Sequence, residues 1–203
     1  MKVKHSLLLG STAFLLSAAA GGWVSVTLTK ASLAGPDGFE NSFEAVSGAW
    51  MYSGKVGSPA ASRAERARVA LGGPLALSSE ETIYFIALED DEGEQLTSSC
   101  DYRITGQPFD TRWWSLTLYD SDTQVFVPNE INRASWNSRA IEYAAEGSWT
   151  VIVSDEPQVG HWLPVHQQST KRFDLLLRLY NPAAETRRSA RTLALPTIER
   201  VQC

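Results

Sequence analysis

Cysteine, histidine and surplus positive charge are all scarce in this 203-residue chain, which holds two cysteines, three histidines and a formal net charge of -5. Two cysteines are too few for a disulfide scaffold or for a zinc site with four thiolate ligands. The acidic balance excludes a broad cationic surface for phosphate backbones, so no nucleic-acid partner is expected. Hydrophobic residues still make up 43% of the chain, enough for one globular domain with its own core.

Common arrangements of hydrolytic and metal-binding residues are absent as well. The sequence has no Gly-x-Ser-x-Gly motif, and its histidines are His5, His161 and His166. The last two are five residues apart without a third ligand nearby, so we expect no metal site and no cofactor. The acidic runs 90–92 and 120–122 lack the ligand spacing of a calcium loop, and we interpret both as hairpin turns. An enzyme is therefore not the favoured interpretation.

Charge is missing from residues 6–29, a run of 24 residues. As a helix this run would be about 36 Å long, enough to cross the hydrocarbon core of a bilayer. Lys2 and Lys4 precede it and predict a cytoplasmic N-terminus, hence a single-pass inner-membrane protein with its C-terminal domain in the periplasm. The alternative is a signal peptide cleaved at Ala18-Ala19-Ala20, which would release the protein to the periplasm. The apolar run continues past that site and favours the uncleaved anchor, with the lipid bilayer as partner.

An oxidising compartment would allow Cys100 and Cys203 to pair. Such a disulfide would close a loop of about a hundred residues and fix the C-terminal tail. Two free thiols are the alternative, and the sequence leaves both open.

Residues 31–74 are expected to form a helical linker between the anchor (1–30) and a β domain (75–203). The apolar spacing between residues 37 and 50 predicts one short amphipathic helix. Ser58-Pro59 predicts the N-cap and first residue of a second helix, which ends at the Gly-Gly-Pro that follows residue 71.

Short β-rich runs separated by turns follow residue 79 and predict an antiparallel β-sandwich or barrel. The expected strands are 82–89, 95–104, 112–119, 124–127, 149–154 and 173–180. The run 112–119 alternates, so that Trp113, Ser115, Thr117 and Tyr119 share the face opposite Trp114, Leu116 and Leu118. The run 173–180 alternates likewise, with Phe173, Leu175, Leu177 and Leu179 directed inward. No helical pattern is long enough for a crossover, which disfavours a parallel α/β fold.

Several ordered segments are similar to one known family. They are Thr82-Ile83-Tyr84-Phe85, Cys100-Asp101-Tyr102-Arg103, Arg112-Trp113-Trp114-Ser115-Leu116-Thr117-Leu118-Tyr119-Asp120, Trp162-Leu163-Pro164 and Leu177-Arg178-Leu179-Tyr180. Together they resemble bacterial domain-of-unknown-function family 1214 over about residues 75–201. The resemblance implies a jelly-roll-like β domain that also occurs alone behind an N-terminal membrane segment, and it implies no settled activity or catalytic residue. His161 and Asn181 depart from the Asn and Gly common at those positions, although Asn tolerates the positive φ of a turn.

Seven tryptophans are the most informative excess in the composition. Aromatic side chains could form a platform for sugar rings or an acyl chain, with polar neighbours supplying hydrogen bonds. The candidate ligand-binding residues are Trp113, Tyr119, Asn132, Arg133, His161, Trp162, Arg178 and Tyr180. The alternative is that these aromatic residues only pack the sandwich.

Three functions from different classes remain open. The favoured one is a membrane-anchored periplasmic β-sandwich protein of unknown biochemical activity that binds an envelope protein or a small amphiphilic or glycan ligand. The second is a hydrolase acting on an amphiphile or glycan through Tyr119, Arg133, Arg178 and His161. The third is a structural subunit of a membrane assembly.

Overall fold

The computed structural model describes residues 15–28, 43–71 and 77–203 except residue 169, and the chain divides into two compact units, 1–41 and 42–203. In the first unit, residues 15–28 are helical and carry exposed apolar side chains such as Trp23. No helix in the described ranges is long and apolar enough to cross a membrane, so the expected transmembrane helix is not supported. The rest of the uncharged run lies outside the described residues.

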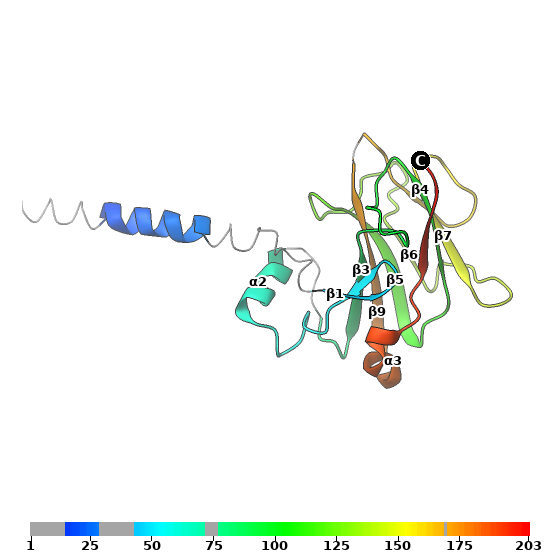
Figure 1. Cartoon of the computed structure of the whole chain (residues 1–203), viewed down its shortest axis with the longest axis horizontal. Coiled ribbons are helices and arrows are strands. Elements are labelled where there is room, and N and C mark those ends of the chain that lie inside the picture. Colours follow the sequence, from blue (N-terminus) through cyan, green and yellow to red (C-terminus); the bar gives the residue numbers. More distant parts are fainter. Residues whose placement is uncertain (1–14, 29–42, 72–76, 169) are drawn as a thin grey trace, which may run out of the picture. The chain divides into compact units, whose positions relative to one another are not determined.

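The second unit contains a six-stranded sheet whose order is β1-β2-β3-β9-β5-β6 (Figure 1). All neighbouring strands in it are antiparallel. The strands are β1 (Glu44–Ser47), β2 (Trp50–Tyr52), β3 (Thr82–Ala87), β9 (Phe173–Pro182), β5 (Thr111–Asp120) and β6 (Ser135–Asn137).

A four-stranded sheet of order β10-β4-β7-β8 completes the unit. Its strands are β10 (Thr197–Gln202), β4 (Asp101–Gly106), β7 (Trp149–Ser154) and β8 (Trp162–Pro164). The β7–β8 pair is parallel and the other pairs are antiparallel. The expected mainly β class with two sheets and few helices is therefore confirmed, although the second sheet is mixed. The jelly-roll connectivity stays a prediction.

Alternate residues of both sheets fill one shared core. Leu175, Leu177 and Leu179 of β9 are fully buried, as predicted from the alternation of this run. Trp114 of β5 stacks on Trp149 of β7, with ring centroids 4.6 Å apart, which joins the two sheets directly. Each such buried side chain contributes about 1.5–3 kcal/mol to folding. The side chains on the opposite face of the six-stranded sheet do not belong to this core.

The helix expected between residues 37 and 50 is wrong over its described part, because β1 and β2 form a hairpin there. Gly48 adopts a positive φ of 54° in the turn, and β2 pairs with β3. Trp50 is buried, and its indole Nε1 donates a hydrogen bond to the Pro196 carbonyl at 2.7 Å. A register shift between Ala45 and Ser47 interrupts the alternation that would have marked a strand.

The second expected helix exists, but it begins later than predicted. Helix α2 spans Arg63–Leu71. Ser62 and Glu65 form a capping box, in which Ser62 N donates to Glu65 Oε2 at 2.7 Å and Glu65 N donates to Ser62 Oγ at 3.2 Å. Ser58 instead accepts a hydrogen bond from Ala60 N within a turn, so Ser58-Pro59 does not start the helix.

Strand prediction succeeded where a strand has a fully buried face. The runs 82–89, 112–119, 149–154 and 173–180 correspond to β3, β5, β7 and β9. The run 95–104 becomes regular only at Asp101, and the run 124–127 contributes an isolated bridge between Phe126 and Tyr119. No sequence pattern predicted β6, β8, β10, helix α3 (Ala184–Arg188) or the 3-10 turn η2 (Ala190–Thr192).

Cys100 and Cys203 form a disulfide, which resolves the alternative left open by the sequence. The two residues are 103 positions apart in the chain. Cys100 immediately precedes β4, and Cys203 follows β10, so the bond joins the ends of two paired strands. The C-terminal strand is thus fixed to the sheet covalently as well as by its hydrogen bonds.

Candidate ligand-binding face

The face of the six-stranded sheet that points away from the core carries a band of polar and aromatic side chains, which we term the outer face. Strand register places Arg178 of β9 between Ser115 of β5 and Tyr84 of β3. Trp113 and Tyr180 are the next pair on β5 and β9. Because successive side chains of a strand alternate, these residues point opposite to the buried leucines.

Arg178 is the central cation of the outer face, and it is half-buried. Its Nη2 donates to the Tyr119 hydroxyl at 2.7 Å, and its Nη1 donates to Thr117 Oγ1 at 3.3 Å. The guanidinium carbon lies 5.5 Å from the centroid of the Tyr119 ring. No carboxylate in the described part of the chain forms an ion pair with Arg178. A guanidinium has five N–H donors, so most of its capacity is not used by these contacts.

Aromatic rings flank Arg178 along the strands. Trp113 and Tyr180 are half-buried, with ring centroids 4.7 Å apart. Tyr119 contacts Phe126, at 5.1 Å between centroids, and Phe126 is 57% exposed. The outer face therefore combines one cation with apolar surface on both sides of it.

Tyr84 lies beside Arg178 on β3 and is almost fully buried. Burial raises the pKa of Tyr84, while a hydrogen bond from the Leu77 N–H and the positive charge of Arg178 act in the opposite direction. The net increase keeps this phenol protonated at neutral pH. The Tyr84 hydroxyl therefore adds no negative charge beside Arg178.

Three other candidate residues gather elsewhere, around Trp136 of β6. The Arg133 guanidinium lies 4.3 Å from the Trp136 ring centroid, and Trp136 Nε1 donates to the Trp162 carbonyl at 3.0 Å. Trp136 stands opposite Leu116, a core residue, so this group belongs to the core side of the β6 edge and not to the outer face. The structure thus separates seven of the eight candidates into two groups.

His161 belongs to the second group and has both ring nitrogens engaged. Its Nε2 accepts a hydrogen bond from Glu142 N at 2.9 Å, and its Nδ1 lies 3.0 Å from the Thr150 carbonyl, to which it donates. This arrangement requires the neutral Nδ1–H tautomer. His161 therefore connects two loops to β7 and has no free nitrogen for proton transfer or metal binding in this geometry.

Trp162 and Asn132 have local roles. Trp162 Nε1 donates to the Ser154 carbonyl at 3.0 Å, which holds β8 beside β7. Asn132 is exposed and adopts a positive φ of 51° in the loop before β6. The structure brings together Trp113, Tyr119, Arg178 and Tyr180, and Asn132 is in neither group. Ligand binding by any of these residues stays a prediction.

Some residues of the outer face were not among the candidates. Ser115 and Thr117 could have been found, since the alternation of the run 112–119 places them on the same face as Trp113 and Tyr119. Tyr84 and Phe126 left no such signal, because their proximity to the site depends on strand pairing and on a loop.

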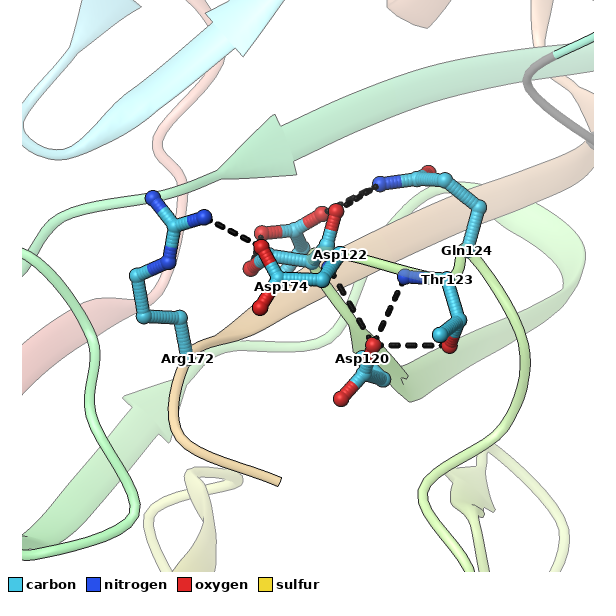
Figure 2. A network of polar contacts seen from close by, with 7 residues as sticks. Asp120, Asp122, Thr123, Gln124, Arg172 and Asp174 are labelled. Atoms are coloured by element: carbon cyan, nitrogen blue, oxygen red, sulfur yellow. Dashed lines mark hydrogen bonds and ion pairs between the residues drawn. The ribbon is translucent and has the colours of Figure 1, made fainter. Parts of the chain in front are cut away.

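The turn after β5 is organised by Asp120, as Figure 2 shows. Asp120 Oδ1 accepts hydrogen bonds from Asp122 N at 3.1 Å and from the Thr123 N–H and hydroxyl at 2.7 Å each. Burial acts to raise the pKa of Asp120, but these hydrogen bonds outweigh it and lower the pKa. The acidic run 120–122 is therefore a hydrogen-bonded turn, as interpreted from the sequence.

The neighbouring carboxylates are also engaged in contacts of their own (Figure 2). Asp174 accepts hydrogen bonds from the Ser121 hydroxyl and from Gln124 Nε2, the latter at 3.2 Å, and Asp122 forms an ion pair with Arg172. Within the described ranges, no group of three or more His, Cys, Asp or Glu residues is arranged to hold a metal ion. These acidic residues stabilise the connection between β5 and β9.

Comparison with known proteins identifies the family. The sequence matches the family model DUF1214, described as a protein of unknown function, over residues 81–184, slightly more than half of the chain. The chain belongs to the DUF1214 family. The family description carries no activity, and no curated protein matches the sequence. In this DUF1214 protein, Asn181 adopts the positive φ that Asn tolerates, 47°, and it lies near the end of β9.

Two solved structures are similar to this DUF1214 protein. The VPA0106 protein from Vibrio parahaemolyticus has 25% sequence identity and a TM-score of 0.58, over 70% of this chain and 36% of that one. An uncharacterized protein from Burkholderia cenocepacia has 19% identity and a TM-score of 0.43, over 92% of this chain and 42% of that one. The chain spans less than half the length of either protein.

Proposed function

We propose that this DUF1214 protein is an envelope protein whose two-sheet domain lies outside the cytoplasm and binds an anionic amphiphile on the outer face. The observation that carries the proposal is Arg178, a half-buried cation with hydroxyl partners and no carboxylate partner among the described residues.

The charge of Arg178 determines the polar half of the ligand. Partial burial of a charged group costs free energy unless hydrogen bonds or an opposite charge compensate for it. Thr117 and Tyr119 supply neutral acceptors only. The planar guanidinium fork is suited to two parallel hydrogen bonds with a carboxylate or phosphate. An anionic head group bound there would complete the contacts of Arg178.

The rings beside Arg178 determine the apolar half. Trp113 and Tyr180 lie on one side and Tyr119 with Phe126 on the other. Rings of this kind bury large apolar area against a ligand at low entropic cost. An acyl chain or a hydrophobic ring attached to the anionic group would contact them, which defines the ligand as an amphiphile.

Two features of the chain support an extracytoplasmic location. The Cys100–Cys203 disulfide is typical of proteins that fold in an oxidising compartment. The uncharged N-terminal run, preceded by two lysines, is typical of a membrane anchor or an export signal. The proposed form is an anchored periplasmic protein, with secretion after cleavage as the alternative.

Binding is favoured over hydrolysis by the surroundings of Arg178. Within the described part of the chain, neither His161 nor His166 contacts Arg178, and His166 Nδ1 is 2.6 Å from Asp155 Oδ1. Nucleophilic catalysis needs a base within hydrogen-bond distance of its nucleophile. The carboxylate of Asp174, opposite Tyr119 in the register, accepts hydrogen bonds from Ser121 and Gln124. Within the described residues, the hydroxyl partners of Arg178 form no hydrogen bond with a histidine or a carboxylate.

The test measures binding of octanoate and of its uncharged analogue octanamide to the full chain in a neutral detergent by isothermal titration calorimetry. Octanoate is expected to bind the wild type and to bind Arg178→Gln at least about tenfold more weakly, because a charge-assisted pair is lost. Octanamide affinity should change less than about twofold, since that ligand carries no charge for Arg178 to recognise. Trp113→Leu should lower the affinity for octanoate and for octanamide to the same extent.

Arg139→Gln is the matched control, because Arg139 is exposed and its side chain forms no hydrogen bond or ion pair within the described ranges. Near-ultraviolet circular dichroism verifies that each variant is folded. Equal octanoate affinity of wild type and Arg178→Gln, or no octanoate binding to the wild type, would overturn the proposal.

A further inference from the structure

A pocket lies beyond the ends of β3 and β9, apart from the contacts of Arg178. It has a volume of about 260 Å³ and is lined by Tyr52, Ser79, Glu80, Ala184, Arg187 and Arg188. We propose that this pocket binds a small phosphate ester that also carries hydroxyl groups, such as glycerol phosphate, with Arg187 as the main cationic contact. This inference does not depend on ligand binding at the outer face.

Three arginines are clustered here although the chain as a whole has a net charge of -5. Arg187, Arg188 and Arg191 fall within five residues of α3 and η2. Arg188 is neutralised by Glu185, at 2.5 Å, and Arg191 pairs with Glu44. The cluster therefore contains two paired arginines and Arg187.

Arg187 differs from its neighbours in its partners. Its Nη1 donates to the Pro182 carbonyl at 3.2 Å, and no carboxylate in the described part of the chain forms an ion pair with it. The carbonyl orients the guanidinium without neutralising it. The other N–H groups of Arg187 remain available for the oxygens of a phosphate, which guanidinium groups bind through paired hydrogen bonds.

The remaining polar groups of the pocket specify the rest of the ligand. Tyr52 and Ser79 supply hydroxyl groups that can donate to phosphate oxygens. Burial raises the pKa of Tyr52, with the charge of Arg191 opposing, so its phenol keeps its proton at neutral pH. Glu80 is an acceptor and would repel a second anionic group, but it can accept hydrogen bonds from ligand hydroxyls. A ligand that carries a phosphate next to free hydroxyl groups can therefore bond to the donors Tyr52 and Ser79 and to the acceptor Glu80.

The size of the pocket limits the ligand further. Its volume is below the roughly 300–1,000 Å³ typical of sites for drug-sized molecules. A head group of the size of glycerol phosphate is consistent with this volume. The same head group occurs as a free metabolite and at the end of phosphatidylglycerol, and the two sources are separated by experiment.

The first arm of the experiment titrates the full chain in a neutral detergent with glycerol 3-phosphate and follows heat by calorimetry. The second arm adds phosphatidylglycerol or phosphatidylcholine to the same micelles and counts retained lipids by native mass spectrometry. Binding in the first arm identifies a free phosphate ester, and retention of phosphatidylglycerol alone in the second identifies a lipid head group. Either result supports the proposed chemistry.

Arg187→Ala should weaken whichever ligand binds by at least about tenfold, while Arg187→Lys, which keeps the charge but loses the fork, should give an intermediate loss. Arg139→Ala serves as the exposed control and should bind as the wild type does. Near-ultraviolet circular dichroism verifies folding of each variant. Binding unchanged in Arg187→Ala, or no binding of either probe to the wild type, would overturn the inference, whatever the outcome with octanoate.

Discussion

Glu65 illustrates how a single half-buried side chain can be held in its charged form by local contacts alone. Its pKa falls from 4.5 to about 2, first because the Ser62 N–H donates to the carboxylate, and then because the Ser62 hydroxyl and Lys55 act in the same direction. Lys55 Nζ lies 3.2 Å from Glu65 Oε1. These contacts fix the first turn of α2, where a negative charge also interacts favourably with the helix dipole.

The protonation of Glu65 should therefore weaken the start of α2 at acidic pH. Because the pKa is lower in the folded state than in the unfolded state, the stabilisation is complete above the unfolded value of 4.5 and is lost as pH falls through about 2. Carbon-13 NMR titration of the Glu65 carboxyl should give a midpoint of about 2. Ser62→Ala should move the midpoint toward 4.5, whereas Ser58→Ala should not change it. A wild-type midpoint near 4.5 would contradict the capping box.

The sequence predicted part of the candidate site, and the remainder depended on contacts between distant segments. Alternation in residues 112–119 correctly placed Trp113 and Tyr119 on one face, and the same rule placed Arg178 opposite the core leucines. That these faces coincide follows from the β5–β9 register, which no local pattern contains. The role of His161 was equally inaccessible, since its partners Glu142 and Thr150 come from other segments.

Among the secondary-structure elements, the central strands were predictable and the marginal ones were not. Strands β3, β5, β7 and β9 have long buried faces that leave a clear apolar pattern. Strand β8 has three residues, and β10 buries only Ile198 fully, so neither run shows a readable pattern. The hairpin of β1 and β2 was mistaken for a helix because its bulge breaks the two-residue period.

Strand β10 depends on tertiary contacts to an unusual degree. Ile198 N donates to Asp91 Oδ2 at 2.8 Å, and Arg200 Nη2 lies 2.7 Å from the fully buried carboxylate of Asp90. The disulfide then ties Cys203 to the start of β4. An edge strand with a single buried side chain is thereby held by a hydrogen bond, an ion pair and a covalent bond.

Replacing both cysteines by serine should lower the free energy of unfolding by about 3–5 kcal/mol, because the unfolded chain regains the entropy of a loop of about a hundred residues. Urea unfolding measures the loss, and hydrogen exchange should show the largest decrease in protection in β10. The wild-type protein treated with a reductant is the matched control and should behave like the double variant. Stability of the double variant within about 1 kcal/mol of the oxidised protein would mean that the noncovalent contacts suffice.

At the scale of the whole molecule, the two units differ in how many of their apolar side chains are exposed and in whether they contain a disulfide. Residues 15–28 expose large apolar side chains, among them Leu15, Leu16 and Trp23, which are energetically unfavourable in water as a contiguous group. The unit 42–203 has one buried apolar core and contains the disulfide. The exposed apolar side chains and the disulfide are the features on which the proposed extracytoplasmic location is based.

The proposed location is tested with alkaline phosphatase, which is active only outside the cytoplasm, fused after Cys203. The fusion should be active, and acid-quenched cells should yield Cys100 and Cys203 without free thiols, because the bond persists only under oxidising conditions. A matched fusion that lacks residues 1–28 should be inactive, and its Cys100 and Cys203 should be free thiols. Retention of the intact fusion in carbonate-washed membranes would identify an anchor, and a soluble periplasmic form would identify cleavage. Phosphatase activity that does not depend on residues 1–28, or free thiols in the complete protein, would contradict export by the N-terminal run. Either result would also contradict the proposal that the amphiphile is bound outside the cytoplasm.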